Sequence, residues 1–110
     1  MTKANFQKWA DVPATEMTPE INRRFITGEK VMSVYLSMDK GGVIPNHHHP
    51  HEQITHVISG KIEYTVGDET RVMSPGEVVF IPPNLPHTGV ALEETRMIEV
   101  FSPPREDFLE

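Results

Sequence analysis

Prolines and glycines interrupt this chain at short intervals and so limit the length of any regular element. The 110 residues contain ten prolines and seven glycines, spread along the chain rather than clustered. Between them lie short runs rich in β-branched and aromatic residues, at roughly the 8–12-residue spacing typical of β-sandwiches and barrels. We expect about seven or eight strands, in the runs INRRFITG, VMSVYLSM, QITHVIS, IEYTV, TRVM, EVVFI, HTGVAL and TRMIEVF. The pattern predicts an all-β chain that closes into a barrel or jelly roll.

The length of the chain fits one domain with a single core. We expect the barrel to span residues 21–110 and to follow an N-terminal arm, residues 1–20, in which two prolines prevent a continuous helix. Only the tail REDFLE is expected to add a helical turn. Phe6 and Trp9 in the arm need burial, so we expect a symmetric homodimer in which the arm crosses onto the partner and protects a sheet edge. An arm that folds back on its own barrel is the alternative.

Composition argues against several classes of protein. The net charge of −6 is unsuited to a nucleic-acid surface, which needs clustered lysines and arginines. No run approaches the ~18 apolar residues of a membrane span, and the start MTKANFQKWADV lacks the apolar core of a signal peptide. We therefore expect a cytoplasmic protein without nucleic-acid or membrane partners. Because the chain has no cysteine, any metal must be held by nitrogen and oxygen atoms.

The stretch GVIPNHHHPHEQITHVISG, residues 42–60, holds five of the six histidines. Side chains on a strand alternate between faces, so His47 and His49 are expected to point the same way and His48 the opposite way. The amide oxygen of Gln53 can join them. His87 follows the proline-rich segment PPNLP and can close a metal site from another strand. We assign no metal role to the other histidines, which are His48, His51 and His56.

The spacing of these residues resembles the two motifs of the cupin family. The first motif matches at Gly41, His47, His49, Gln53 and Gly60, with Gln53 where the family usually has Glu. The second matches at Gly76, Pro82 and His87, with Asn84 and Ala91 where the family usually has Gly and Asn. The resemblance implies a single-domain double-stranded β-helix, a jelly-roll barrel. It also implies one divalent transition metal, held by His47, His49, Gln53 and His87.

The neutral Gln53 affects what such a metal can do. Without a negative ligand the ion keeps its full charge, so it binds less tightly but polarises an anionic substrate oxygen more strongly. This arrangement suits Lewis-acid chemistry on a carboxylate or enolate more than redox chemistry. Nickel, zinc, iron and manganese are all compatible with imidazole and amide ligands.

The stretch MIEVFSPPREDFL, residues 97–109, carries the second group of candidate residues. Met97, Glu99 and Phe101 share one face of the expected strand, and alternation alone favours an outward Glu99. If Glu99 faces inward instead, its carboxyl group lies in apolar surroundings suited to proton transfer. Arg105 follows a proline turn that can return it to the barrel mouth to bind a carboxylate. A solvated surface position for Arg105 is the alternative.

Gln53 as third ligand, the run HPHEQ and the tail VFSPPREDFL resemble the pectin-degradation cupins of the KdgF type. These act on 4,5-unsaturated monouronates released from pectin and alginate. The resemblance implies a metal-dependent, non-redox lyase or isomerase that opens the sugar ring to the linear 5-keto-4-deoxyuronate. Its catalytic set falls on Glu99, Phe101 and Arg105, with Glu99 where the family usually has Asp. A non-catalytic sugar- or small-molecule-binding cupin and a metal-dependent dioxygenase are the alternatives.

Overall fold

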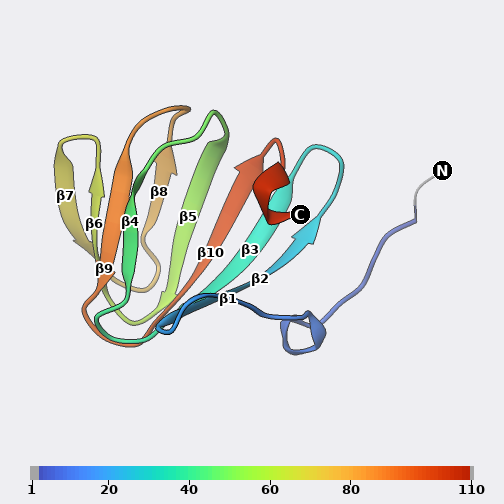
Figure 1. Cartoon of the computed structure of the whole chain (residues 1–110), viewed down its shortest axis with the longest axis horizontal. Helices are drawn as coiled ribbons and strands as arrows, with labels where there is room; N and C mark the ends of the chain where they lie inside the picture. The colour runs from blue at the N-terminus through green and yellow to red at the C-terminus, as the bar shows by residue number, and fades with distance from the viewer. Residues whose placement is uncertain (1–2, 110) are drawn as a thin grey trace.

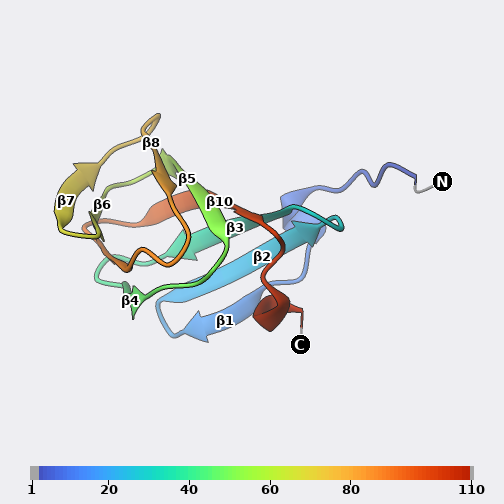
Figure 2. The ribbon, with the colours of Figure 1, turned by 90° about the horizontal axis from the view of Figure 1, so that it is seen from above.

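Two antiparallel sheets face each other in the computed structural model of the chain, which describes residues 3–109 (Figures 1 and 2). The six-stranded sheet has the order β1-β2-β3-β10-β5-β8, and the four-stranded sheet has the order β4-β9-β6-β7. The strands are β1 (Thr15–Thr18), β2 (Ile21–Thr27), β3 (Met32–Met38), β4 (Val43–His47), β5 (Glu52–Ser59), β6 (Ile62–Val66), β7 (Glu69–Met73), β8 (Val78–Ile81), β9 (His87–Ala91) and β10 (Thr95–Ser102). From β3 onward the chain passes back and forth between the sheets, which confirms the predicted double-stranded β-helix.

Every predicted run forms a strand, and the structure adds β1 and β4. Sequence patterns missed both because β1 has little apolar character and β4 contains Pro45, a residue that weakens a strand signal. Two 3-10 turns, Trp9–Asp11 and Glu106–Phe108, are the helical elements of residues 3–109. The second is the helical turn expected in the tail. Neither turn is long or apolar enough to cross a membrane.

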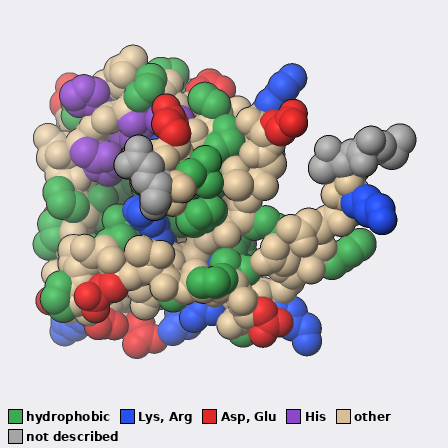
Figure 3. All heavy atoms as spheres, turned by 45° about the vertical axis from the view of Figure 1, so that its right-hand side comes forward, with side chains coloured by type: hydrophobic (Ala, Val, Ile, Leu, Met, Phe, Trp, Pro, Cys, Tyr) green, Lys and Arg blue, Asp and Glu red, His purple; other side chains and the backbone are tan. Residues whose placement is uncertain are grey.

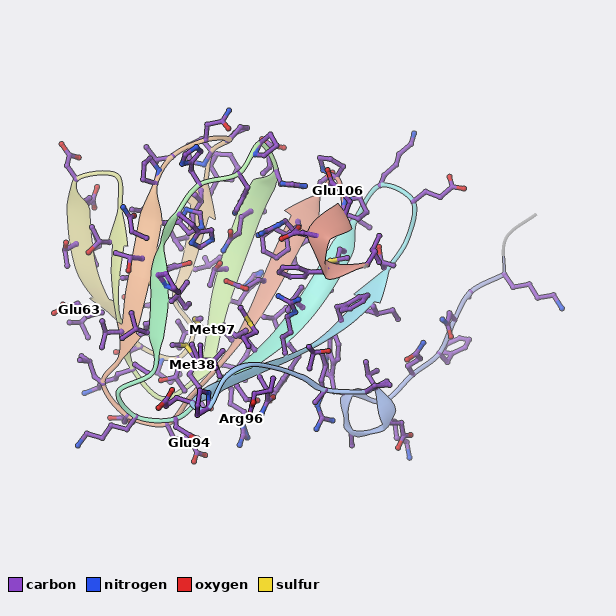
Figure 4. The ribbon with its side chains drawn as sticks, viewed as in Figure 1. Met38, Glu63, Glu94, Arg96, Met97 and Glu106 are labelled. Carbon is purple, nitrogen blue, oxygen red and sulfur yellow. The ribbon has the colours of Figure 1, made fainter. Side chains whose placement is uncertain are left out.

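The core is divided into two apolar clusters that are separated by polar side chains. The larger cluster fills the space between the sheets and includes Leu36, Val57, Tyr64 and Met97. The smaller consists of Met32, Val34 and Phe101, with Phe25 and Phe108 packed against it. In Figure 4, Met38 and Met97 of the larger cluster lie at the end of the molecule away from Glu106. Burial of each large side chain contributes about 1.5–3 kcal/mol, so both clusters hold the strands that flank the polar region between them.

The N-terminal segment is partly strand and partly extended chain. β1 pairs with β2 at the edge of the six-stranded sheet. Trp9 packs on Tyr35 of that sheet, with ring centroids 5.5 Å apart, and its carbonyl accepts a hydrogen bond from Arg24 at 2.7 Å. Phe6 remains 96% exposed on chain that extends away from the barrel (Figure 1). The homodimer and the division at residues 20 and 21 stay predictions, and both predicted segments include end residues outside the described range.

Gly60, at the turn between β5 and β6, has a backbone conformation that favours glycine. Its φ is +87°, and a Cβ there would lie 2.6 Å from the Thr95 hydroxyl and closer still to the Glu94 carbonyl oxygen. Gly76 also has a positive φ, +91°, but a Cβ there meets nothing within 4 Å. The two positions therefore share conformational strain but differ in steric clash.

We expect Gly60→Ala to lower the free energy of unfolding by about 3 kcal/mol or more, because a left-handed conformation and a backbone clash act together. Gly76→Ala, the matched control, should lower it by about 1–2 kcal/mol through conformation alone. Chemical denaturation of both variants measures the difference. Equal losses at the two glycines would show that the Glu94 contact does not constrain the turn.

Candidate metal centre and adjoining pocket

Three imidazoles meet where β4 and β9 lie side by side. His47 at the end of β4 is paired in register with His87 at the start of β9, and their ring centroids are 4.3 Å apart. His49 lies 5.5 Å from His47 and 5.0 Å from His87 by the same measure. One nitrogen from each ring lies within 4.8 Å of the other two. This histidine trio can hold a metal ion, and Figure 3 shows histidines gathered at that end of the molecule.

The trio forms by a different route from the one that strand alternation predicts. β4 ends at His47, so His49 lies in the following loop rather than on the strand. The loop nevertheless turns its ring inward, and His49 is buried whereas His48 is exposed. His56 is exposed on β5. Neither His48 nor His56 belongs to the group of three.

The second nitrogen of each ring is held by the backbone. A carbonyl oxygen can only accept, so each Nδ1 carries the proton and each Nε2 keeps its lone pair for a ligand bond. The acceptors are backbone carbonyl oxygens: that of Pro45 lies 2.8 Å from Nδ1 of His47, that of His51 lies 3.2 Å from Nδ1 of His49, and that of Leu85 lies 2.9 Å from Nδ1 of His87. Within residues 3–109 the buried Nε2 of His87 has no hydrogen-bond partner. An unsatisfied acceptor of this kind fits a metal ligand.

The surroundings of His49 and His87 favour the neutral form of both rings. Burial lowers the pKa of His87 to about 4, and the neighbouring His47 and His49 lower it further against the opposing effect of the Leu85 carbonyl. Burial, followed by the charge of Arg105, lowers the pKa of His49. Neutral imidazoles offer the lone pairs that metal binding requires.

Gln53 joins the histidine trio to an acidic group. Its side chain is 1% exposed, and its Oε1 lies 3.0 Å from Nε2 of His49. Both atoms are acceptors, so their close approach favours a cation between or beside them. The amide nitrogen donates to the Glu99 carboxylate at 3.0 Å and to the Thr55 hydroxyl at 2.9 Å. Three imidazole nitrogens and one amide oxygen therefore fit a divalent transition metal.

Glu99 faces inward, so the outward orientation favoured by alternation was wrong. The side chain is 7% exposed and lies between Met97 and Phe101 on the buried face of β10. Alternation could not assign the face because Ile98 and Val100 make the opposite face apolar as well. Burial raises the pKa of the Glu99 carboxyl to about 7, against the opposing charges of Arg105 and Arg23 and the hydrogen bond from Gln53.

A pocket of about 240 Å³ adjoins the trio. Its lining includes His47, Gln53, Glu99, Phe101, Arg105 and Arg23. The structure thus brings the predicted catalytic residues to one pocket beside the predicted metal ligands. Arg105 is half-buried in the lining rather than fully solvated, and it donates from Nε and Nη2 to the Asp107 carboxylate at 3.0 and 2.9 Å.

Sequence reasoning missed two residues of this region. Arg23 reaches the pocket from β2, and no local pattern distinguishes it from the neighbouring Arg24. His51, assigned no role, is buried, and its Nε2 donates to Glu106 at 2.9 Å. This bond ties the histidine loop to the C-terminal turn, an association between distant segments that sequence spacing does not reveal.

A model of the cupin domain matches residues 34–101, more than half of the chain. This match, together with the double-stranded β-helix and the histidine trio, shows that the chain belongs to the cupin family. The pectin degradation protein KdgF of Dickeya dadantii is 34% identical over 102 residues, which cover 90% of this chain and 93% of that protein. This relationship confirms the resemblance to KdgF-type cupins.

Solved structures agree with this relationship. KdgF from a Halomonas species is 31% identical, with a TM-score of 0.92 over 96% of this chain and 99% of that one. An RmlC-like cupin from Shewanella frigidimarina is 27% identical, with a TM-score of 0.91 over 96% of each chain. The whole described fold is therefore shared with these proteins.

We expect the purified protein to bind about one divalent metal ion per chain, because the trio and Gln53 supply the donor set of a single site. His49→Ala should weaken metal binding by at least about 100-fold, since it removes a direct ligand. His48→Ala is the matched control, because it removes the neighbouring imidazole from an exposed position. Elemental analysis after dialysis and the melting temperature with and without chelator give the readouts. Equal metal content in the two variants would contradict the site.

Proposed function

We propose that the chain is a metal-dependent, non-redox lyase or isomerase that opens the ring of 4,5-unsaturated monouronates to linear 5-keto-4-deoxyuronates. The observation that carries this proposal is a pocket lined by a buried carboxyl group, a guanidinium group and His47, one member of the adjoining histidine trio. The relationship to KdgF, a pectin degradation protein, supports the choice of substrate.

The pocket suits a small ligand. Its volume of about 240 Å³ is below the ~300–1,000 Å³ typical of sites for drug-sized molecules. One sugar ring fits this scale better than an oligosaccharide does. Apolar side chains, including Phe101, line it together with the charged groups, as expected of a site that binds a ring with one charged substituent.

The proposed reaction is an isomerisation without net gain or loss of atoms. The substrate is a cyclic enol ether whose C4=C5 double bond is conjugated to a carboxylate on C5. Removal of the C1 hydroxyl proton forms the C1 carbonyl and breaks the bond between C1 and the ring oxygen, which leaves as an enolate. Protonation at C4 then produces the C5 ketone. No electron is exchanged with a second reactant.

The residues of the pocket take distinct parts in this scheme. Glu99 moves protons, and its carboxyl group is oriented by the amide of Gln53. Arg105 orients the substrate carboxylate, and Phe101 forms part of the wall, with its ring centroid 5.6 Å from that of His49. The trio and Gln53 would hold a divalent ion, which would supply Lewis acidity for negative charge on a substrate oxygen.

The test follows the loss of conjugated-alkene absorbance of an unsaturated monouronate above the uncatalysed rate. Glu99→Gln should lower kcat by about 100-fold or more, because it removes a proton carrier. Glu99→Asp keeps a carboxyl group and should retain much of the activity. Glu63→Gln is the matched control, since Glu63 is exposed and points away from the barrel (Figure 4).

Other outcomes would identify the alternatives. Full turnover by Glu99→Gln would remove Glu99 from the mechanism. Binding of a monouronate without acceleration by the metal-loaded protein would favour a non-catalytic binding cupin. Oxygen uptake that tracks turnover would favour a dioxygenase, because ring opening consumes no oxygen.

A further inference from the structure

The pocket contains a second guanidinium group, from a part of the chain that neither cupin motif includes. Arg23 lies on β2, with Leu36 of β3 as its register partner. It is half-buried and lines the same pocket as Glu99 and Arg105. Ile21, two residues earlier on the strand, belongs to the apolar core. Arg23 therefore points from the six-stranded sheet toward the space between the sheets.

Arg23 differs from Arg105 because none of the carboxylates in residues 3–109 forms a salt bridge with it. The fork of Arg105 is engaged by the Asp107 carboxylate through two hydrogen bonds. Within residues 3–109, the buried Nε of Arg23 has no hydrogen-bond partner, and Arg23 takes part in none of the salt bridges. Its guanidinium carbon lies 3.6 Å from the centroid of the Phe108 ring. An aromatic ring covers a face of the guanidinium plane, whereas the N–H donors lie in that plane and are not engaged by the ring.

The charge of Arg23 is poorly compensated at this position. Burial lowers the pKa of its guanidinium group, and the neighbouring Arg105 lowers it further, whereas Asp107 and Glu99 have the opposite effect. A partly buried cation without a hydrogen-bonded partner is unfavourable. An anion that entered the pocket would compensate the charge of Arg23 and would meet a pre-oriented planar donor.

We propose that Arg23 is a specificity-determining residue that binds the carboxylate of a monosaccharide-sized ligand in this pocket. The identity of the ligand as a monouronate rests on the proposed function, but recognition of the carboxylate itself does not depend on turnover. The planar guanidinium group selects a carboxylate over the hydroxymethyl group of a neutral sugar. Arg105 also lines this pocket, so the carboxylate that the proposed function assigns to Arg105 is shared with Arg23.

The binding experiment uses galacturonate, a saturated monouronate that cannot undergo the ring opening, and galactose as its neutral counterpart. Isothermal titration calorimetry on the metal-loaded protein should show tighter binding of galacturonate. Arg23→Gln should weaken galacturonate binding by about tenfold or more, through loss of charge-assisted hydrogen bonds. Arg24→Gln is the matched control: it removes the same charge from the next residue, whose side chain instead donates to the Trp9 carbonyl. That variant should bind as wild type does.

Arg23→Lys keeps the charge but not the planar fork, so it should bind galacturonate more weakly than wild type. If circular dichroism shows that Arg23→Gln does not fold, the binding of galacturonate by Arg23→Lys tests the role of Arg23 instead. Wild-type affinity for galacturonate in either Arg23 variant would overturn the proposal. Equal binding of galacturonate and galactose to the wild-type protein, or no binding of galacturonate, would overturn it as well.

Kinetics separates this proposal from the proposed function. With the unsaturated monouronate, Arg23→Gln should raise KM by about tenfold, and kcat should change less. Suppose that the wild-type protein turns over the substrate and that Arg23→Gln has the wild-type KM and galacturonate affinity. This result would overturn the role of Arg23 and would leave the ring-opening activity standing. Galacturonate binding that depends on Arg23 in a protein without turnover would support the role of Arg23 and overturn the activity.

Discussion

The amide of Gln53 connects the two chemical halves of the pocket, and the character of the site depends on how this side chain is held. Its oxygen faces the imidazole of His49, and its nitrogen donates to the carboxylate of Glu99. A glutamate at this position would place a second carboxylate next to Glu99. Two carboxylates at such a short distance do not both ionise readily. Because the amide is neutral, Glu99 can lie beside the histidine trio without a second carboxylate that would compete with it for a bound cation.

This polar connection is stable inside the barrel because the strands on either side are held by apolar contacts. Thr55 on β5 and Glu99 on β10 are register partners, and Gln53 is paired with Phe101 on the same two strands. Val57 and Met97 anchor one end of this region, and Phe101 anchors the other. A slip of one residue between β5 and β10 would turn the polar side chains outward, so the two apolar clusters also determine the orientation of the site.

The C-terminal turn completes the pocket through contacts with separate walls. Glu106 bonds to His51 in the histidine loop, and Phe108 covers the guanidinium group of Arg23 on β2. Arg105, between the barrel and these contacts, is oriented by Asp107 within the turn itself. Figure 4 shows Glu106 on this turn near the ends of β3 and β10. The short tail thus links the histidine loop to the sheet that carries Glu99 and Arg23.

The amino-acid sequence alone determined the short strands, the jelly-roll class and the histidines that converge, because turn residues and motif spacing are local properties. Local patterns did not determine the face of Glu99, since both faces of β10 carry apolar residues and the packing of the second sheet decides which is buried. They also gave His49 a strand position, whereas a loop and a carbonyl bond orient its ring. Arg23 reaches the site because β2 pairs with β3, and both Arg23 and His51 contact the distant C-terminal turn. Such contacts depend on where remote segments meet, and only the tertiary structure decides that.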